Sequence, residues 1–455
     1  MRFATINPIN NQLVKRFKQH RWWQVEAMLK KAEFGFGINR TSSFKLRSKR
    51  LYAVAELLLN KKHHYAQLIS LEMGKPIVQS VAEIEKCAAV CTYYADNAMH
   101  FLCDEPIKTE HALSVITHAP MGVLLGVMPW NFPFWQVFRF VAPALMAGNV
   151  VLIKHAPNVP QCALAIEGLF REAQFPEGLY QNVFIHHNKV KWLIDDKRIV
   201  AITLTGSDTA GAKVAEQAGR QIKKTVLELG GSDPFIVLDD ANVKEAVAAG
   251  IKSRMLNSGQ SCIAAKRFIV LENIAKDFIE LAVAEIRNLN MGDPMNVATD
   301  VGPLAREDLV KILTQQVKIS MKMGAEALIG GNRAVERKGC YFNPTLLIGV
   351  TASMPVYKEE VFGPVAPVIV VKTAQEAIDV ANDTPYGLGA SIWTTDTDKA
   401  MRLSRRIQAG CVFVNEMVKS DPRLPFGGVK RSGYGRELSV YGIKEFVNTK
   451  TLLIK

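Results

Sequence analysis

The turn that ends at Cys262 is one place where this sequence could carry covalent chemistry. Small and polar residues fill the segment Asn257–Cys262, which lies between an expected helix and an expected strand. A thiol in such a turn can reach a cleft instead of filling a core, and its thiolate is a strong nucleophile. Because most cysteines are buried and inert, this turn alone is a weak signal for a nucleophile.

Glu228 and Asn131 are two polar residues that acid–base chemistry could use. Glu228 lies among apolar residues just before Gly230 and Gly231, and burial there would raise the pKa of its carboxyl toward the range of a general base. A solvated acid at a strand edge fits the same pattern. Asn131 follows an expected strand within Pro129–Pro133. Its amide could donate to an oxyanion or cap the next helix.

Alternating strands and helices must position these residues from about residue 120 onward. A first series has expected strands at 123–127, 150–153, 183–185 and 199–204, with helices at 161–173 and 208–221. A second series has expected strands at 235–238, 268–271, 388–393 and 411–414, with helices at 241–257, 274–289, 374–382 and 398–408. This alternation predicts parallel sheets covered by helices. We therefore expect two α/β units joined near residue 230, preceded by helical spacing over residues 43–100.

The charge and composition narrow the class of protein. The chain has 455 residues, with 56 Lys and Arg against 43 Asp and Glu, which gives a net charge of +13. Basic clusters such as 45–50 have no interleaved aromatic residues, so a nucleic-acid platform is not expected. The apolar stretch 121–153 is broken by three prolines, which argues against a membrane span.

The cysteines and the first residues suggest where the protein works. Seven cysteines are an odd number without a CxxC pair, which is typical of a reducing cytoplasmic setting. The first residues contain no apolar run of the kind that a secretion signal requires. We therefore expect a cytoplasmic protein.

Several common ligand motifs are missing from the sequence. No GxGxxG follows a strand, and the segment 206–213 fails as a phosphate loop because its lysine is one place late and Val214 replaces Ser or Thr. All nine histidines lie at or before His187 without metal-like spacing, so no metal site is expected. Gly206 and Ser207 end a strand and begin a helix, where backbone N–H groups suit a phosphate or simply a capped helix.

Taken together, seven segments in order resemble the aldehyde dehydrogenase superfamily nearly from end to end. They are Pro129–Pro133, Leu152–Lys154, Leu204–Ser207, Leu227–Gly231, Gly259–Cys262, Glu359–Pro364 and Pro425–Glu437. The resemblance implies a variant Rossmann cofactor domain over 1–101 and 120–229, and a catalytic domain over 230–444. It also implies a small β oligomerisation arm from 102–119 and 445–455, and hence a homodimer or homotetramer.

The resemblance assigns roles to the three chemical residues. Cys262 would attack an aldehyde as a thiolate, and the oxyanion would be held by the Asn131 side chain and the Cys262 N–H. After hydride transfer, Glu228 would activate the water that hydrolyses the thioester. The family uses no metal. Some members form a regulatory disulfide two positions from the nucleophile, but Gln260 and Ala264 occupy those positions here.

The resemblance also implies NAD or NADP as the cofactor. Its contacts would be Trp130, Lys154, Gly206, Ser207, Leu229, Glu360 and Phe362. Lys154 would meet the adenosine ribose, and Gly206 and Ser207 the pyrophosphate. NAD-restricted members often have a Glu three residues after the lysine, where it repels a 2′-phosphate. Pro157 stands there instead, so we expect both cofactors to be used.

Arg139 makes the resemblance more specific. Succinate-semialdehyde dehydrogenases carry an arginine eight residues after the asparagine, where a guanidinium fork suits the distal carboxylate of the substrate. Ser420 and Phe426 are further candidate substrate contacts. A second arginine of some members is Leu256 here, and Arg254 lies about 200° around a helix from it. An internal salt bridge or an interface contact remains an alternative for Arg139.

The function expected from this resemblance is oxidation of succinate semialdehyde to succinate. Glutarate semialdehyde and a neutral or amino aldehyde remain alternative substrates for the same chemistry. A catalytically inactive binding protein with this fold is a more remote alternative. The presence of Cys262, Glu228 and Asn131 together argues against it.

Overall fold

A six-stranded sheet organises the first half of the molecule. The computed structural model describes residues 3–455. The strand order is β17 (Gly433–Tyr434), β9 (Lys224–Glu228), β8 (Ile199–Thr205), β5 (Val123–Val127), β6 (Val150–Lys154) and β7 (Tyr180–Asn182). All neighbours pair in parallel except β17, which runs antiparallel to β9. The carboxyl ends of β5, β6, β8 and β9 therefore share one edge of the sheet.

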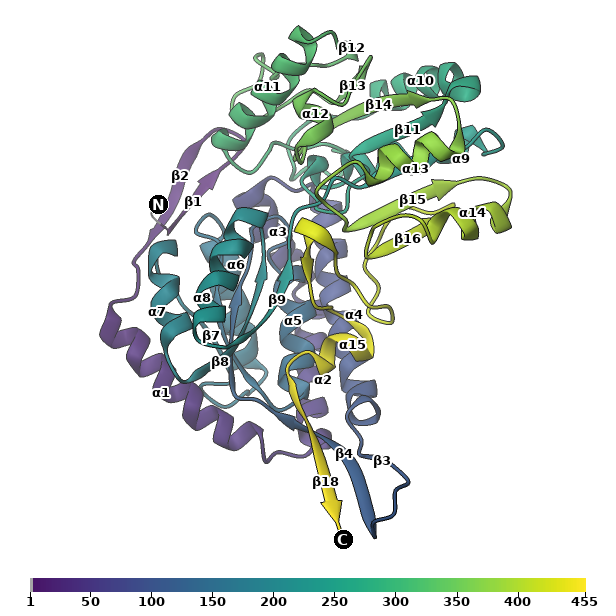
Figure 1. Cartoon of the computed structure of the whole chain (residues 1–455). Helices are drawn as coiled ribbons and strands as arrows, with labels where there is room; N and C mark the ends of the chain where they lie inside the picture. The colour runs from purple at the N-terminus through teal and green to yellow at the C-terminus, as the bar shows by residue number, and fades with distance from the viewer. Residues whose placement is uncertain (1–2) are drawn as a thin grey trace.

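Helices cover this sheet, which is why its strands are almost continuously apolar. Every residue of β6 is buried, as expected for a parallel strand packed on both faces. The surrounding helices are α1 (Trp22–Asn39), α2 (Phe44–Asn60), α3 (Lys62–Met73), α4 (Ile77–Phe101), α5 (Trp135–Met146), α6 (Pro160–Glu172), α7 (Val190–Asp195) and α8 (Asp208–Arg220). Figure 1 shows them around the lower sheet.

A seven-stranded sheet organises the second unit. Its order is β12 (Glu326–Ile329), β13 (Thr345–Ile348), β14 (Val365–Val371), β11 (Arg267–Leu271), β10 (Pro234–Val237), β15 (Gly389–Trp393) and β16 (Cys411–Val414). Only β12 is antiparallel to its neighbour. Its helices are α9 (Val243–Met255), α10 (Glu272–Arg287), α11 (Glu307–Lys322), α12 (Pro355–Lys358), α13 (Ala374–Asn382) and α14 (Thr397–Ser404).

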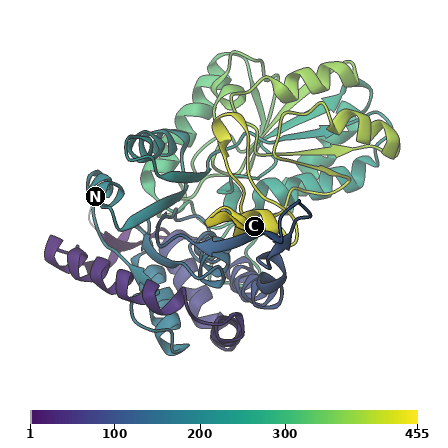
Figure 2. The same ribbon diagram turned by 60° about the horizontal axis from the view of Figure 1, so that its bottom comes forward.

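Two smaller β-structures complete the fold. The strands β3 (Glu105–Pro106), β4 (Leu113–Pro120) and β18 (Val447–Ile454) form an antiparallel sheet in the order β18-β4-β3. This sheet, the arm below, projects from the body in Figure 1 and lies toward the viewer in Figure 2, beside both α/β units. The hairpin of β1 (Phe3–Asn7) and β2 (Gln12–Phe17) reaches the second unit, because the Cys340 N–H donates to the Pro8 carbonyl at 2.9 Å.

The predicted α/β class with two parallel-sheet units is confirmed, but one predicted strand is wrong. Residues 183–185 are not a strand, and β7 ends just before them. The Val183 N–H still donates to Ile153 at 2.8 Å, but the Phe184 carbonyl then accepts from His20 N–H at 2.8 Å. The chain thus turns away from the sheet and contacts the N-terminal segment at His20. Residues 183–185 are apolar because they are buried there.

Residues 433–444 contact the first unit, although the sequence analysis assigned them to the catalytic domain over 230–444. The strand β17 pairs with β9 of the first sheet, with Gly433 opposite Glu228. Helix α15 (Ser439–Lys444) packs on α4 and α5 of the same unit. The domain division stays a prediction, with residues 433–444 attached to the first sheet. Within residues 3–455, no helix has the length and apolar character that a membrane crossing needs.

Candidate active site

The turn before Cys262 has an unusual backbone. Helix α9 ends, and Asn257, Ser258 and Gly259 follow with φ of 55°, 54° and 75°. The left-handed region costs roughly 1–3 kcal/mol for a residue other than glycine, so surrounding contacts must impose it. The Asn257 side chain donates to the Asn131 carbonyl at 2.8 Å, and Ser258 Oγ donates to the Gly302 carbonyl at 2.9 Å.

Arg254 fastens this turn to the loop that carries Glu360. Its guanidinium is fully buried, and Nη2 donates to the carbonyls of Gly259 at 2.7 Å and Gly363 at 2.5 Å. A third donation reaches the Val361 carbonyl at 3.2 Å. Arg254 therefore faces backbone carbonyls rather than the pocket beside Cys262, which agrees with the doubt about it as a substrate contact.

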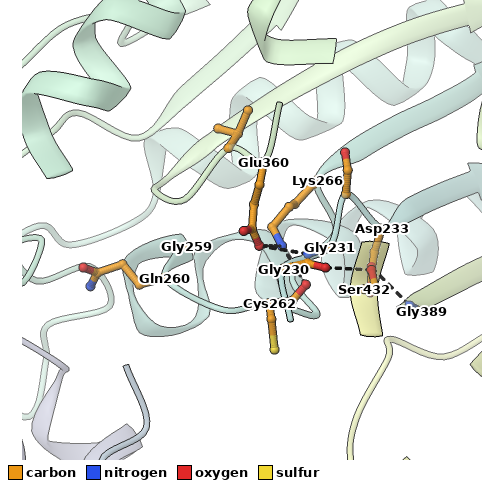
Figure 3. A network of polar contacts seen from close by, with 12 residues as sticks. Gly230, Gly231, Asp233, Gly259, Gln260, Cys262, Lys266, Glu360, Gly389 and Ser432 are labelled. Atoms are coloured by element: carbon orange, nitrogen blue, oxygen red, sulfur yellow. Dashed lines mark hydrogen bonds and ion pairs between the residues drawn. The ribbon is translucent and has the colours of Figure 1, made fainter. Parts of the chain in front are cut away.

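Cys262 lies in the wall of a pocket with a volume of about 440 Å³. Its side chain is partly exposed there, and in Figure 3 the sulfur points away from Lys266 and Glu360. Burial raises the pKa of this thiol to about 11, although the charges of Arg139 and Lys266 oppose the rise. The resting nucleophile is therefore a thiol at neutral pH, and it needs a base to become a thiolate.

Asn131 lies beside this nucleophile. Its side chain is buried, and Nδ2 donates to the Gln260 carbonyl at 3.1 Å. The second N–H of this amide has no acceptor among the described residues, so it is available to a ligand. The Gln260 side chain is itself fixed, because its Oε1 accepts from the Ala305 N–H at 2.8 Å. Asn131 is thus held as a donor next to the Cys262 turn.

Glu228 ends β9 as a buried carboxyl group. Burial raises the pKa of Glu228 well above its usual range, Arg139 opposes this, and Glu437 adds to it. Oε2 lies 3.6 Å from Arg139 Nη2, and Oε1 has no partner within residues 3–455. One cation thus stands between two buried carboxyls, and a carboxyl group whose pKa is raised by burial suits a general base.

The structure places Arg139 in the pocket wall, but with partners of its own. Its guanidinium forms an ion pair with Glu437, lies 3.6 Å from Glu228, and stacks over the Phe426 ring at 4.9 Å. Nη2 also donates to Thr205 Oγ1 at 3.4 Å. Phe426 lines the pocket, and its role as a substrate contact stays a prediction. The role of Arg139 as the carboxylate receptor stays a prediction.

Lys266 is a central residue that the sequence analysis missed. Its Nζ donates to Glu360 Oε1 at 2.8 Å and to the Cys262 carbonyl at 2.6 Å. The Gly231 N–H donates to the same Glu360 oxygen at 3.1 Å (Figure 3). The sequence signal that could have identified Lys266 is its position four residues after the candidate nucleophile Cys262. Its buried charge holds the Cys262 backbone and lowers the pKa of the thiol.

The predicted cofactor residues gather at the shared edge of the six-stranded sheet. The Lys154 ammonium is buried at the end of β6 with no ion-pair or hydrogen-bond partner in the described chain, and burial lowers its pKa to about 8. An unpartnered buried cation fits a sugar or phosphate oxygen. Trp130 and Phe362 meet edge to face at 5.8 Å, both partly exposed. These residues fit a dinucleotide.

Three predicted cofactor contacts form hydrogen bonds within the protein, two through the backbone and one through a side chain. The Gly206 N–H donates to the Glu228 carbonyl at 3.0 Å, and the Leu229 N–H to the Ser432 carbonyl at 3.0 Å. Ser207 is exposed and caps α8, where its Oγ accepts from the Ala210 N–H at 3.3 Å. Ser432 also donates to the Gly230 carbonyl at 2.7 Å (Figure 3). Gly206 and Leu229 thus shape the edge through their backbone positions.

Lys86 is a second pocket residue that the sequence analysis missed. It extends from α4, and its Nζ donates to Ser420 Oγ at 2.7 Å and lies 4.2 Å from the centre of the Trp135 ring. Ser420, a predicted substrate contact, is buried and lines the pocket. No motif marks Lys86, because its partners lie in distant segments. Over residues 3–455, no three His, Cys, Asp or Glu side chains are grouped to hold a metal ion.

Comparison with known proteins identifies the family. The profile of the Aldehyde dehydrogenase family matches residues 1–452. A probable NADP-dependent succinate-semialdehyde dehydrogenase of Synechocystis is 51% identical over 454 residues, covering 100% of both chains. An NADP-dependent succinate-semialdehyde dehydrogenase of Mycobacterium tuberculosis is 46% identical over 457 residues, again covering 100% of both.

Solved structures give the same result. The succinic semialdehyde dehydrogenase of Streptococcus pyogenes, determined in complex with NADP⁺, superposes with a TM-score of 0.97 at 38% identity, over 99% of both chains. A succinate-semialdehyde dehydrogenase of Burkholderia pseudomallei gives 0.97 at 31% identity, over 100% of this chain and 94% of that one. With the Cys262 thiol in the pocket wall, the Asn131 amide beside the turn before it and the Glu228 carboxyl 3.6 Å from Arg139 of that wall, this chain belongs to the aldehyde dehydrogenase family.

Proposed function

We propose that this protein oxidises succinate semialdehyde to succinate, with NAD⁺ or NADP⁺ as the hydride acceptor. The observation that carries the proposal is a single pocket that holds the Cys262 thiol together with basic side chains. Those are Lys86, Arg139 and Lys252, together with Lys75 and Lys419, which are paired with Glu83 and Glu416. Such a wall attracts a substrate that carries a negative charge at the end away from the aldehyde. The full-length relatives named for this activity support it.

The first step is attack of Cys262 on the aldehyde carbon. The thiol gives its proton to water, a carbon–sulfur bond forms, and the carbonyl π bond opens so that the oxygen becomes an oxyanion. The Asn131 Nδ2–H and the Cys262 backbone N–H are the donors proposed for that oxygen. One such donor lowers the activation free energy by about 3 kcal/mol. The fixed turn over Asn257–Gly259 keeps both donors in place.

The cofactor supplies the hydride acceptor that turns the adduct into a thioester. Lys154 is proposed to hold its adenosine ribose, and Ser207 its pyrophosphate, at the edge of the six-stranded sheet. Trp130 and Phe362 are proposed to flank the nicotinamide half, while Glu360 binds the nicotinamide ribose. The Lys266 ammonium holds the Glu360 carboxylate in place through the 2.8 Å ion pair.

Hydrolysis of the thioester needs a base. Glu228 takes a proton from a water molecule, the resulting hydroxide attacks the thioester carbon, and the acid leaves as the Cys262 sulfur is released. Because burial raises the pKa of Glu228, the carboxylate is basic enough for this proton transfer.

We also propose that the protein is a cytoplasmic homodimer or homotetramer. All seven cysteines are free thiols, which supports a reducing compartment. The arm supports the oligomer, because β18 is an edge strand that exposes Leu452, Leu453 and Ile454. An unpaired apolar edge of this kind is stable in solution when it is covered by another chain.

A panel of aldehydes assayed with both cofactors tests the activity. The expected result is a higher kcat/KM for succinate semialdehyde than for butanal, measured by formation of the reduced nicotinamide. Glutarate semialdehyde and an amino aldehyde are included, and a higher value for either would reassign the substrate. Pro157 leaves no carboxylate to repel a 2′-phosphate, so both cofactors should work. A preference for NAD⁺ beyond about a thousandfold would contradict this expectation.

A further inference from the structure

The Lys266 side chain contacts three residues that the proposed reaction uses. Its Nζ donates to the Cys262 carbonyl at 2.6 Å and to Glu360 Oε1 at 2.8 Å. It also lies 5.8 Å from the centre of the Phe362 ring. In Figure 3 the two hydrogen bonds meet at the ammonium. One charge thus joins the nucleophile to two residues that are proposed to contact the nicotinamide half of the cofactor.

The ammonium has a fixed position because its backbone and its surroundings are fixed. Lys266 directly precedes β11, a strand in which every residue is buried. The Lys266 N–H donates to the Asp233 carbonyl at 3.0 Å, and the Arg267 N–H donates to the same carbonyl at 3.2 Å. The Lys266 side chain is fully buried. It therefore offers a rigid point to which more mobile groups can be tied.

Glu360 is held through one oxygen of its carboxylate and leaves the other one for a ligand. Oε1 accepts from Lys266 and from the Gly231 N–H at 3.1 Å. Oε2 lies beside Gly230, where a Cβ would approach it to 2.4 Å. Only a residue without a side chain leaves Oε2 in this place. The carboxylate is thus oriented before any ribose hydroxyl reaches it.

Arg254 links the same two segments, but through the backbone. Its Nη2 donates to the carbonyls of Gly259 and Gly363, so it sets the spacing of the turn and the loop. Within residues 3–455, the ion pair of Glu360 is made by Lys266. The orientation of the Glu360 side chain relative to Cys262 therefore depends on Lys266 and not on Arg254.

We propose that Lys266 is a positioning residue for hydride transfer, because its ammonium fixes Glu360 and Phe362 relative to Cys262. This inference rests on the proposed oxidation of an aldehyde with a nicotinamide cofactor. Hydride passes from the carbon bound to Cys262 only when the acceptor lies in contact with it. A displacement of about 1 Å can lower such a rate by about a hundredfold.

A simpler role for Lys266 is to act on the thiol alone. Arg139 and Lys266 lower the pKa of Cys262, whereas Glu360 and Glu228 raise it. Loss of Lys266 would then slow the attack on the aldehyde and leave hydride transfer as it was. The two roles can be separated with a substrate that acylates Cys262 without hydride transfer.

4-Nitrophenyl acetate is such a substrate. The thiol gives its proton to water, the sulfur bonds to the ester carbon, and 4-nitrophenolate leaves, so that an acetyl thioester remains. In Lys266→Met the initial burst of 4-nitrophenolate should slow by the same factor as alkylation of Cys262 by iodoacetamide, because both depend on the thiolate. The first turnover of aldehyde oxidation, followed by stopped flow, should slow by about a further tenfold or more.

Deuterium on the aldehyde carbon identifies the step that has become slow. It should slow the first turnover of Lys266→Met more than that of the wild type, because breaking of the C–H bond now limits the rate. If oxidation falls only as much as the 4-nitrophenolate burst, with no larger isotope effect, Lys266 acts on the thiol alone and the proposal is wrong.

The matched control is a lysine whose ion pair lies on the surface. Lys399 pairs with Asp239 at 3.1 Å, and Lys399→Met should change each of these rates by less than about threefold. A loss in Lys399→Met equal to that in Lys266→Met would overturn the proposal. If Lys266→Met does not fold, Lys266→Gln removes the same charge, keeps N–H donors and provides the same comparison.

A binding measurement separates this proposal from the proposed function. The fluorescence of bound NADPH or NADH comes from the reduced nicotinamide ring, so its anisotropy reports how firmly that ring is held. The anisotropy should be lower in Lys266→Met than in the wild type and in Lys399→Met. If no aldehyde is oxidised, the proposed function fails, and this comparison still decides the role of Lys266. Equal anisotropy in all three proteins, or no binding of either cofactor, would overturn the proposal.

Discussion

The thiol of Cys262 is protonated in the resting structure, which leads to a prediction about its reactivity. With a pKa of about 11, the thiolate fraction of the cofactor-free enzyme should rise about tenfold per pH unit between pH 7 and 10. The rate of alkylation by iodoacetamide, measured at the Cys262 peptide, should rise in parallel. Exposed Cys103 is the internal control. A rate that is already constant above pH 8 would mean that a thiolate is preformed.

Arg139, Glu228 and Glu437 form a buried group in which the two partners of Glu228 act in opposite directions. Arg139 lowers the pKa of Glu228, and Glu437 raises it. The base form of Glu228 is lost as pH falls through its pKa. Arg139→Met should therefore move the acidic limb of the kcat profile to higher pH, and Glu437→Gln should move it to lower pH.

This pair of variants also decides the sequence-based role of Arg139. Arg139→Met should lower kcat for succinate semialdehyde and butanal alike, because the catalytic carboxyl has lost its neighbour. It should also lower the melting temperature, since an unpaired buried carboxyl costs about 3–5 kcal/mol. A rise in KM for succinate semialdehyde alone would instead support Arg139 as the carboxylate receptor.

Some site residues could be inferred from the sequence because short motifs contain them. Cys262, Glu228 and Asn131 each lie in a segment typical of the family. Cys262 lines the pocket, Asn131 contacts the turn before it, and Glu228 lies 3.6 Å from the pocket residue Arg139. Lys266 and Lys86 were missed for a physical reason. Lys86 meets Ser420, 334 residues away, and Lys266 meets Glu360, 94 residues away. Only the contact of Lys266 with Cys262, four residues earlier, left a local signal.

At the scale of single elements, the turn before Cys262 should be very sensitive to added volume. Gly259 has a φ of +75°, and a Cβ there would lie 2.2 Å from the Gly363 carbonyl oxygen. Gly259→Ala should therefore lower kcat by at least about tenfold and reduce the melting temperature. Both effects are expected because the added methyl group would push the turn at Gly259 away from the loop at Gly363, which Arg254 links to it.

A second glycine provides the control for this substitution. Gly37 lies in α1, and a Cβ at that position has no atom within 4 Å. Gly37→Ala should leave kcat unchanged and stabilise the protein by about 1 kcal/mol, because alanine favours a helix. Thermal unfolding and steady-state kinetics measure both variants. Similar effects of the two substitutions would contradict this account of the turn.

Helices and strands with long regular patterns were predictable, and short ones were not. The periodic segment Ala374–Asn382 is α13 without a shift, and Cys411–Val414 is β16. The two-residue strand β17 has no pattern of its own and exists because β9 offers an open edge. Residues 183–185 have the apolar character of a strand, but they pack against the N-terminal segment instead.

At the scale of the whole molecule, the arm should determine the oligomeric state. Its strand β18 pairs with β4 on one side only and exposes Leu452 and Ile454. Replacing both residues with lysine should convert the proposed homodimer or homotetramer into a monomer of 50.4 kDa, because charged edges resist pairing. Light scattering after size-exclusion chromatography measures the mass. An unchanged mass would place the interface elsewhere.

The pairing of Gly433 with Glu228 has a consequence for the order in which the enzyme is built. The ribosome makes β9 about two hundred residues before it makes the strand that borders it. Until β17 has been synthesised, the edge of β9 that carries Glu228 is unpaired. The six-stranded sheet of the first unit is therefore incomplete until then. Nascent chains that stop short of residue 433 should therefore stay inactive, which confines aldehyde chemistry to fully synthesised molecules.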